Sequence, residues 1–476
     1  MDFKQDAGIL VRLLEEYHQE SREQRQPVLQ LPKLAELIAH LDLDPFIANG
    51  GLTGAALESF LRRYLSATTR LHHPAYFAHQ VAVPHYAGSL AAMVDGFTNN
   101  PMAIYEMGPA AAAIEYFIVN WMLEKAGWAP MPPVPGEGIS GGHGAGVLTH
   151  GGSLANLTAL IAARTRVAPD VWESGVPADL AILAPMQSHY SIARAAGILG
   201  LGKRALYPLE VDERGVVKPD RLTAALQRLT ADGRRPMALV ANGCSTAVGC
   251  YDPLREIAAF CREHAIWLHV DGAHGASALL SRQRRVLLAG VELADSMIWD
   301  AHKMLRTAPL CAAVLVRDHR DLEGAFHQEA SYLFHAKSQP GVDMIHRTVE
   351  CTKAALGLRL FMVLGAMGER GLADYVDRQS NRALQAYRYF ESQPDFSCPV
   401  EPQSNILCFA YRDWNEEHLR IRDRMIADGS FYLSTTQLNG RWYLRLVFMN
   451  PISGMKEVEA LADRLRESES DRPESR

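Results

Sequence analysis

The sequence SMIWDAHKMLRTAPLCAAV, from Ser296 to Val314, places three polar side chains between two apolar runs. Asp300, His302 and Lys303 follow a run with the composition of a buried β-strand, and a second such run comes after them. Burying a charge is costly unless the charge is paired or used in chemistry. Lys303 is therefore either an exposed loop lysine or a reactive amine at a partly buried site.

Strand-like apolar runs and helical segments alternate on both sides of this stretch. The helical pattern DPLREIAAFCREH (252–264), for example, stands between two of the runs. This alternation predicts an α/β fold with a mostly parallel sheet covered by helices. Ligands bind beyond the carboxyl ends of the strands in such sheets, so residues that follow a strand are candidates for a site. The expected strands are 180–185, 204–210, 237–242, 266–271, 296–300 and 312–317.

The chain is expected to have three parts. Residues 1–95 have the pattern of helices joined by loops, residues 96–360 carry the α/β alternation, and residues 361–476 have the pattern of a smaller α+β domain. The Pro/Gly-rich stretch 129–153 is expected to be a loop with a role for its backbone. The segment 109–128 is apolar almost all round, which predicts a helix buried in a large core or in an interface.

The composition argues against several classes of protein. The 476 residues carry a formal net charge of −6, which offers no basic excess for nucleic-acid phosphates. No apolar stretch has the length of a membrane span, and the N-terminus has the pattern of an acidic amphipathic helix instead of a signal peptide. Seven cysteines without a C-x-x-C pair indicate reduced thiols and a cytoplasmic location. We expect neither a nucleic-acid nor a membrane partner.

Two weaker patterns are not taken as sites. The sequence GEGISG (136–141) matches G-x-G-x-x-G, but no strand precedes it and no helix follows it, so a nicotinamide site is not expected. His72, His73, His143 and His150 lack the spacing to cysteine or carboxylate partners that metal ligands have, so no metal is expected.

Three further motifs stand at strand ends or helix starts. Asp271 ends the run IWLHVD and is either a charge at the ligand-binding edge of the sheet or a helix N-cap. Gly151, Gly152 and Ser153 precede a helical segment, where N–H groups and the helix dipole bind an anion such as phosphate. The alternative there is a glycine turn with Ser153 as N-cap. His189 opens another helical segment, as a cap or as a catalytic group.

Together these parts fit one cofactor, pyridoxal 5′-phosphate (PLP). The glycine-rich helix start would hold the phosphate, and the lysine amine would form a Schiff base with the aldehyde. The aspartate would keep the pyridine nitrogen protonated, so that the ring withdraws electrons. The histidine ring would stack on the pyridine.

The chain resembles the PLP-dependent group II amino acid decarboxylases, which include the glutamate, cysteine sulfinate, aromatic amino acid and 2,4-diaminobutyrate enzymes. This resemblance covers most of the chain. It implies fold type I, with a large PLP-binding domain built on a mostly parallel seven-stranded sheet, an N-terminal helical segment and a small C-terminal α+β domain. The motifs that carry it are HHPAYFAH (72–79), NNPMAIYEMGPAAAAIE (99–115), THGGSLANLTALIAAR (149–164), SHYSIARAAGILG (188–200), HVDGAHGA (269–276), WDAHKML (299–305) and RWYLRLVFMNP (441–451).

The resemblance also implies residue roles. Lys303 would be the Schiff-base lysine, Asp271 the partner of the pyridinium, and His189 the stacking residue that helps to protonate the product. The family's Gly-Thr-Thr motif stands here as Cys244-Ser245-Thr246, which retains Thr246 and changes the two residues before it. The other cofactor residues that the resemblance implies are Gly152, Ser153, Thr246, Ala273, Asp300, His302 and Thr352.

The family consists of obligate dimers with the active site at the interface. The resemblance therefore implies a homodimer in which the partner chain supplies residues near 99–101 and around Thr352 and Lys353. Aromatic decarboxylases carry a loop tyrosine as the Cα proton donor, but the equivalent stretch, 338–353, contains none. His346, His189 and Tyr332 are the candidate donors.

The expected activity is decarboxylation of an L-amino acid to its amine and carbon dioxide. Resemblance to subgroups favours a small polar or charged substrate, such as 2,4-diaminobutyrate or aspartate. One alternative is another fold-type-I PLP enzyme, such as an aldehyde-forming relative or an aminotransferase. A non-catalytic scaffold is the third hypothesis, and the presence of both Lys303 and Asp271 argues against it.

Overall fold

The computed structural model describes residues 2–132, 142–326 and 341–470. Contacts within the chain divide it into two units. The larger comprises Pro84–Ser380 and Pro402–Ser404, and the smaller comprises Met1–Val83, Asn381–Glu401 and Asn405–Arg476. The expected boundaries at residues 95 and 360 fall inside helices α5 (Tyr86–Thr98) and α13 (Leu356–Glu391). The three-part division stays a prediction.

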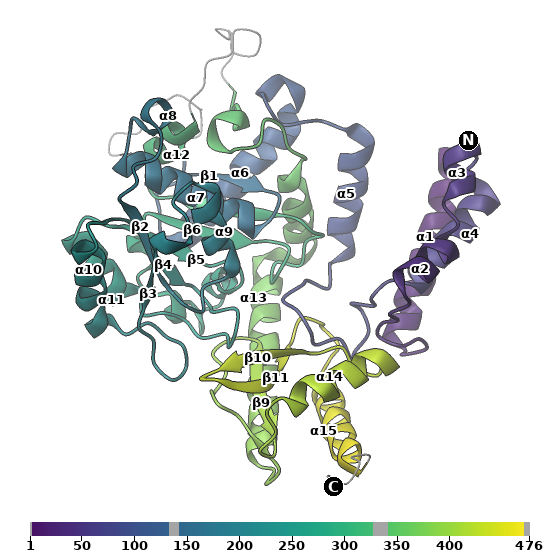
Figure 1. The fold of residues 1–476 in the computed structure, drawn as a ribbon. Coiled ribbons are helices and arrows are strands. Elements are labelled where there is room, and N and C mark those ends of the chain that lie inside the picture. Colours follow the sequence, from purple (N-terminus) through teal and green to yellow (C-terminus); the bar gives the residue numbers. More distant parts are fainter. Residues whose placement is uncertain (1, 133–141, 327–340, 471–476) are drawn as a thin grey trace. The chain divides into compact units, whose positions relative to one another are not determined.

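The larger unit contains a seven-stranded sheet with the order β1-β7-β6-β5-β4-β2-β3 (Figure 1). Strands β3, β2, β4, β5 and β6 pair in parallel, whereas β7 runs antiparallel to its neighbours β6 and β1. The expectation of an α/β fold with a mostly parallel sheet is confirmed. The strands are β1 (Ala145–Thr149), β2 (Leu180–Pro185), β3 (Leu206–Leu209), β4 (Arg235–Asn242), β5 (Trp267–Asp271), β6 (Ser296–Asp300) and β7 (Ala312–Val316).

Strand β1 corrects the expectation of a continuous loop over 129–153. All five residues of β1 are buried. The strand pairs with β7 in the sheet, and helix α6 packs against it. A Cβ at Gly146 would lie 2.7 Å from the carbonyl oxygen of Val314, so glycine permits the close pairing of β1 with β7. The glycines that make this stretch look like a loop are thus partly a packing requirement of the strand.

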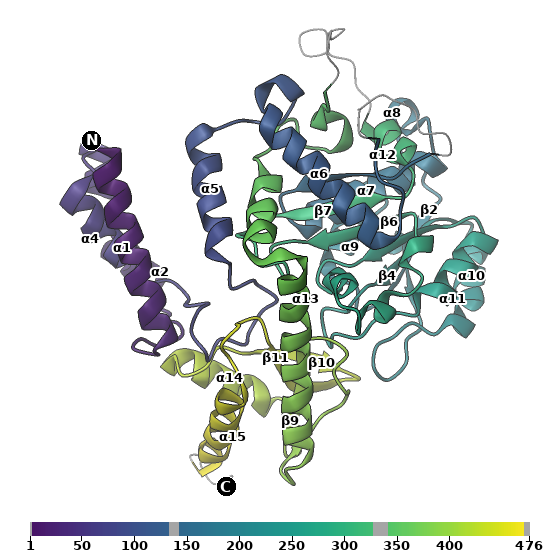
Figure 2. The same ribbon diagram turned by 180° about the vertical axis from the view of Figure 1, so that it is seen from behind.

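Helices cover both faces of this sheet. Helix α7 (Gly152–Val167) packs against β4 to β7, and α6 (Pro109–Ala126) crosses the opposite face over β1 and β7 (Figures 1 and 2). The 109–128 segment forms a helix with eight buried residues, as expected of a core helix, while Phe117 is 63% exposed in the single chain, so burial of that side in an interface stays a prediction. The other helices of this unit include α8 (Val171–Ser174), α9 (Tyr190–Ile198), α10 (Leu222–Ala231), α11 (Leu254–Glu263) and α12 (His319–Phe326).

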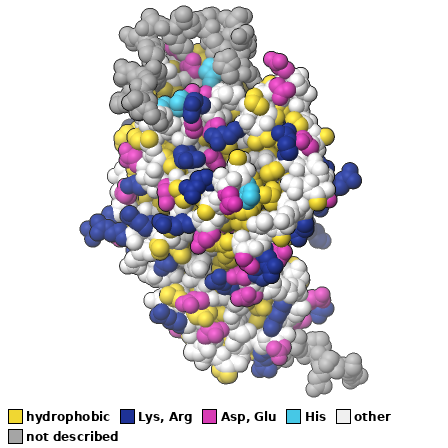
Figure 3. All heavy atoms as spheres, turned by 90° about the vertical axis from the view of Figure 1, so that its left-hand side faces the viewer, with side chains coloured by type: hydrophobic (Ala, Val, Ile, Leu, Met, Phe, Trp, Pro, Cys, Tyr) yellow, Lys and Arg dark blue, Asp and Glu magenta, His cyan; other side chains and the backbone are white. Residues whose placement is uncertain are grey.

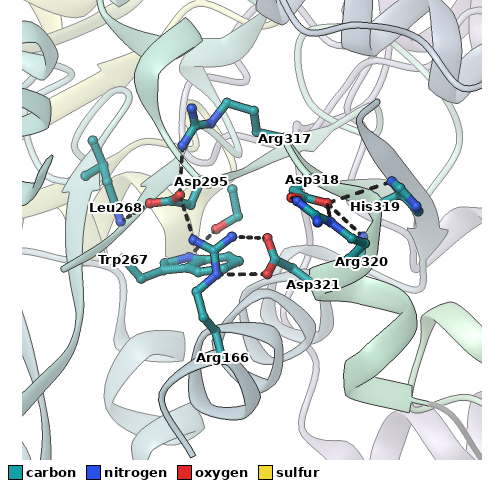
Figure 4. A network of polar contacts seen from close by, with 10 residues as sticks. Arg166, Trp267, Leu268, Asp295, Arg317, Asp318, His319, Arg320 and Asp321 are labelled. Atoms are coloured by element: carbon teal, nitrogen blue, oxygen red, sulfur yellow. Dashed lines mark hydrogen bonds and ion pairs between the residues drawn. The ribbon is translucent and has the colours of Figure 1, made fainter. Parts of the chain in front are cut away.

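An ion-pair network ties α7 to the edge of the sheet where β5 and β6 begin. Arg166, in the last turn of α7, forms a two-pronged contact with Asp321 and reaches Asp295 at 3.3 Å (Figure 4). Asp295 also accepts from Arg317 at 3.0 Å. The Arg166 guanidinium lies 4.7 Å from the ring centre of Trp267. Every charge in this group is paired, so the network stabilises the edge opposite the strands' carboxyl ends.

The smaller unit contains a four-stranded antiparallel sheet with the order β10-β11-β9-β8. Its core is rich in aromatic rings, among them Phe390 and Phe409, which stack with their centres 4.2 Å apart. The strands are β8 (Phe396–Ser397), β9 (Ile406–Tyr411), β10 (Ser434–Leu438) and β11 (Arg441–Val447). The helices, besides the end of α13, are α1 (Phe3–Arg22), α2 (Leu34–Leu41), α3 (Asp44–Asn49), α4 (Gly54–Ser66), α14 (Glu417–Asp428) and α15 (Met455–Ser470).

Basic and acidic side chains are interspersed on the face of the molecule that Figure 3 shows. Exposed ion pairs include Arg235 with Asp179, 2.7 Å apart. None of the helices in the described part of the chain combines the length and the apolar character that crossing a bilayer requires.

Candidate active site

A cavity of ≈ 280 Å³ lies in the larger unit beyond the carboxyl ends of β1, β2, β4, β5 and β6. The predicted cofactor residues, except Thr352, all line it. They are Gly152, Ser153, His189, Thr246, Asp271, Ala273, Asp300, His302 and Lys303. Six further residues, which the sequence did not single out as site residues, complete much of the lining: His150, Asn156, Cys244, His274, Ile298 and Leu310.

Lys303 lies in the turn that follows β6. Its side chain is 18% exposed, and its Nζ is 3.3 Å from Oδ2 of Asp300. Asp300 is buried, with 2% of its side chain exposed, and its Oδ2 also lies 3.6 Å from Nε2 of His302. The lysine is therefore part of the cavity wall and not an exposed loop residue.

The start of α7 forms a glycine-lined cradle beside Asp300. Gly151 is the N-cap residue, with φ of 105°, a value that glycine adopts readily. A Cβ at Gly152 would lie 2.8 Å from Oδ2 and 2.9 Å from Oδ1 of Asp300. The alternative in which Ser153 caps the helix is wrong, because the helix already begins at Gly152 and no side chain caps it. The first N–H groups of a helix lack partners within it, which suits an anion.

Asp271 stands at the end of β5 with both carboxylate oxygens engaged. Oδ1 accepts from the backbone N–H of Ala273 at 3.2 Å, and Oδ2 accepts from Nδ2 of Asn156 at 3.0 Å. Asn156 is 1% exposed and lies one turn into α7. Sequence reasoning passed over Asn156, although it stands four residues after Gly152, on the same side of the helix.

His189 is both a helix cap and part of the cavity wall. It is the N-cap of α9, and its Nδ1 accepts from the backbone N–H of Ser191 at 3.3 Å. Burial of the imidazole lowers the pKa of His189 below its ordinary value. The cap is confirmed, and the catalytic role stays a prediction.

Cys244 is the residue at which the chain departs most from the family motif. Its φ of 121° lies in the region that favours glycine, which matches the glycine of Gly-Thr-Thr. Cys244 lines the cavity together with Thr246, whereas Ser245 is buried and its Oγ accepts from the backbone N–H of Cys250 at 3.3 Å. The change at this motif thus places a thiol in the wall of the cavity.

The segment before α13 corrects one expectation about the partner chain. Lys353, predicted to reach a partner's site, is buried within its own chain, where it pairs with Glu115 and donates to the carbonyl oxygen of Leu148. Thr352 is exposed and does not line the cavity of its own subunit. Its predicted role stays a prediction. Nearby, Glu350 contacts Nδ1 of His150 at the rim of the cavity.

The candidate proton donors are not all near the cavity. His346 belongs to a short 3-10 helix, Met344–Arg347, and does not line it. Tyr332 and the GEGISG motif lie outside the described residues. Of the three candidates, His189 lines the cavity.

The side chains present fit PLP. Oδ1 of Asp300 has no hydrogen-bond partner among the described residues, although it is buried beside the α7 cradle. A buried orphan acceptor is costly, so it requires a donor when the cavity is filled, and the phosphate, which only accepts, is not that donor. The cavity also combines an amine, a carboxylate and a glycine-rich helix start, which are the groups that the aldehyde, the pyridine nitrogen and the phosphate require. Residues 2–132, 142–326 and 341–470 contain no cluster of side chains suited to a metal ion.

Comparisons with known proteins identify the family of the chain. A family model described as the pyridoxal-dependent decarboxylase conserved domain matches residues 57–412. Acidic amino acid decarboxylase GADL1 from Homo sapiens is 29% identical over 448 residues, covering 89% of this chain and 83% of that protein. Cysteine sulfinic acid decarboxylase from Rattus norvegicus is 27% identical over 451 residues, covering 90% and 88%. The crystal structure of mouse CSAD in apo form matches with a TM-score of 0.85 and 25% identity, covering 97% of both chains.

The family model spans well over half of the chain, and the matched structure extends over nearly all of it. The expectations of fold type I, of PLP as cofactor and of carboxy-lyase activity are confirmed. The chain belongs to the group II family of pyridoxal phosphate-dependent amino acid decarboxylases.

Proposed function

We propose that the protein decarboxylates a small acidic L-amino acid, such as aspartate or cysteine sulfinate, to the corresponding amine and carbon dioxide. The observation that carries the proposal is the convergence of Lys303, Asp271 and the Gly152–Ser153 helix start on one cavity. The names of two relatives, an acidic amino acid decarboxylase and a cysteine sulfinic acid decarboxylase, support the acidic substrate over 2,4-diaminobutyrate.

Each wall of the cavity is proposed to hold one part of the cofactor. PLP, when bound, supplies an aldehyde that reacts with amines and a ring that accepts the electrons left by departing carbon dioxide. Lys303 would attach the cofactor through its amine, and the N–H groups of Gly152 and Ser153 would bind the phosphate. Asp271 would keep the proton on the pyridine nitrogen, because a carboxylate beside that nitrogen favours its charged form.

The remaining lining residues are proposed to orient the ring and the lysine. His189 would lie against one face of the ring and Ala273 against the other, and Thr246 would contact the ring substituents. Asp300 and His302 would hold the Lys303 amine in place, in keeping with the 3.3 Å separation of Asp300 and Lys303.

We also propose that His189 helps to deliver the proton that replaces carbon dioxide at Cα. Support comes from its position in the cavity wall, which His346 does not share. Burial lowers the pKa of His189, so its imidazole is neutral near pH 7. A neutral imidazole passes a proton on by accepting one at one nitrogen and donating one at the other.

A homodimer and a cytoplasmic location complete the proposal. An exposed apolar face on α5, formed by Tyr86, Leu90, Met93, Val94 and Phe97, supports a partner subunit that would also supply Thr352. The seven cysteines are all free thiols, which supports a reducing compartment.

The test is a product assay with purified protein, PLP and each of the common L-amino acids together with cysteine sulfinate. We expect carbon dioxide and amine in equal amounts from aspartate or cysteine sulfinate. The variant Lys303→Ala should release none, whereas Lys203→Ala, which removes an exposed lysine elsewhere, should match the parent protein. Carbon dioxide from 2,4-diaminobutyrate alone would overturn the substrate class. An aldehyde or a keto acid as product would favour the other fold-type-I activities, and no carbon dioxide from any substrate would overturn the proposal.

A further inference from the structure

We infer that Asn156 and His269 are positioning residues, which fix the Asp271 carboxylate and hold His189 in the tautomer with its proton on Nε2. This inference rests on the proposed roles of Asp271 and His189. Neither Asn156 nor His269 carries a charge or a reactive group that the reaction itself requires. Their importance follows from a chain of hydrogen bonds that branches at Asn156, which we name the Asn156 network. Trp267, Ser296 and His269 lead to Asn156, from which one branch reaches Asp271 and the other reaches Ser191 and His189.

The orientation of the Asn156 amide follows from its neighbours. One end of the amide lies 3.0 Å from Oδ2 of Asp271 and 2.9 Å from Oγ of Ser191. A carboxylate only accepts hydrogen bonds, so this end must be the NH₂ group, and both of its protons are used. Turning the amide over would set its oxygen against the Asp271 carboxylate in a buried site, where repulsion is strong.

The amide oxygen then fixes the state of His269. That oxygen can only accept, so Nε2 of His269, 2.8 Å away, carries a proton and donates it. His269 is fully buried, and burial lowers its pKa to about 4, so the ring is neutral. Nδ1 of His269 therefore accepts a hydrogen bond, and the hydroxyl of Ser296, whose Oγ lies 2.8 Å from this nitrogen, donates it. The hydrogen bonds that link Asn156, His269 and Ser296 therefore each have a single direction from donor to acceptor.

The far end of the network is anchored at the ion pairs described above. Ser296 accepts from Nε1 of Trp267 at 2.8 Å, so its single proton is free for His269. The ring of Trp267 lies under the Arg166 guanidinium (Figure 4). One end of the Asn156 network is thus fixed at the ion-paired edge of the sheet, which suits residues that hold the Asp271 carboxylate in position.

The opposite branch fixes His189. Ser191 accepts from Asn156, so its hydroxyl proton points to Nδ1 of His189, 2.8 Å away. The backbone N–H of Ser191 also donates to this nitrogen. Nδ1 is an acceptor in both contacts, and a neutral imidazole must then carry its proton on Nε2. The same amide that steadies Asp271 therefore also decides which nitrogen of His189 is protonated.

The test compares isosteric variants by the dissociation constant for PLP, measured on the protein freed of cofactor. We expect Asn156→Leu to weaken binding about 10- to 100-fold, as the loss of a hydrogen bond to a charged group would. His269→Gln retains an N–H near the Asn156 oxygen and should stay within about 3-fold, whereas His269→Leu should weaken binding by about 10-fold or more. Thr158→Val is the matched control, because Thr158 is buried in the same helix and its hydroxyl donates to the carbonyl oxygen of Leu154, outside the Asn156 network.

The second readout is the tautomer of His189, taken from ¹⁵N spectra of histidine-labelled holoenzyme with His189→Gln to assign the signal. We expect Nε2–H in the parent protein and loss of this preference in Asn156→Leu and Ser191→Ala. Equal PLP affinity in His269→Gln and His269→Leu, or Nδ1–H at His189 in the parent protein, would overturn the inference. Failure of the parent protein to bind PLP would overturn the proposed function instead, so the two failures are distinguishable.

Discussion

Replacing Gly152 with alanine tests whether the start of α7 is the cofactor's phosphate cradle. The added Cβ would stand 2.8 Å from Oδ2 of Asp300, 0.6 Å inside the 3.4 Å at which ordinary contacts begin. Asp300 is 2% exposed and has Lys303 as a neighbour, so it has little room to move away. Overpacking of this kind costs about 1 to 3 kcal/mol. Because the clash forces Asp300 and the helix start apart where the phosphate is proposed to bind, an equal loss of binding free energy would raise the dissociation constant for PLP about 5- to 150-fold.

The assay is fluorescence titration of cofactor-free protein with PLP, paired with a urea unfolding curve for each variant. Gly197→Ala is the control, because Gly197 lies in helix α9 with nothing within 4 Å of an added Cβ. Gly197→Ala should leave PLP binding unchanged and stabilise the helix by up to about 1 kcal/mol. Unchanged PLP affinity in Gly152→Ala would refute the reasoning, since Asp300 and the start of α7 would then have moved apart without any effect on cofactor binding.

Three further predictions concern stability. Lys353→Met leaves Glu115 charged and buried, and it should lower the unfolding free energy by about 3 to 5 kcal/mol. The double variant Lys353→Met with Glu115→Leu should recover much of this loss. Losses that add up in the double variant would contradict the pairing. Because burial lowers the pKa of His269 to about 4, the unfolded chain binds a proton that the folded chain does not between about pH 4 and 6.5. The unfolding free energy should therefore fall by about 2 to 3 kcal/mol as the pH decreases through this window, and His269→Gln should weaken that dependence. Arg166→Lys keeps the charge but loses the two-pronged contact with Asp321, and it should lower the unfolding free energy by about 1 kcal/mol in urea unfolding. An unchanged unfolding free energy would contradict a stabilising role for this contact.

The sequence predicted the parts of the fold that have a simple hydrophobic pattern. The run 296–300 coincides with β6 and 180–185 coincides with β2, because both strands are fully buried and have apolar residues through their centres. Strand β1 was missed because its sequence, AGVLT, is short and stands within a glycine-rich stretch. Glycine there serves close strand pairing, which a local pattern does not distinguish from a turn.

Site residues were predictable from sequence where a charged or reactive side chain directly follows a strand. Lys303 and Asp271 are of this kind, and both line the cavity. Asn156 was not predictable in this way, because nothing in the helical sequence marks it. Its role depends on the fold, which brings His269 and Asp271 within hydrogen-bond distance of the two ends of its amide. The burial of Lys353 against Glu115 likewise depends on residues more than two hundred positions apart, which a local motif does not reveal.

The most direct measurement of the central claim is the position of the cofactor's covalent link. Holoenzyme reduced with borohydride would retain a pyridoxyl group on the attached lysine, and peptide mapping would locate that group. The account predicts a single label on Lys303, in the peptide that contains WDAHKML (299–305). A label on any other lysine, or none in protein that releases carbon dioxide from an amino acid, would contradict it.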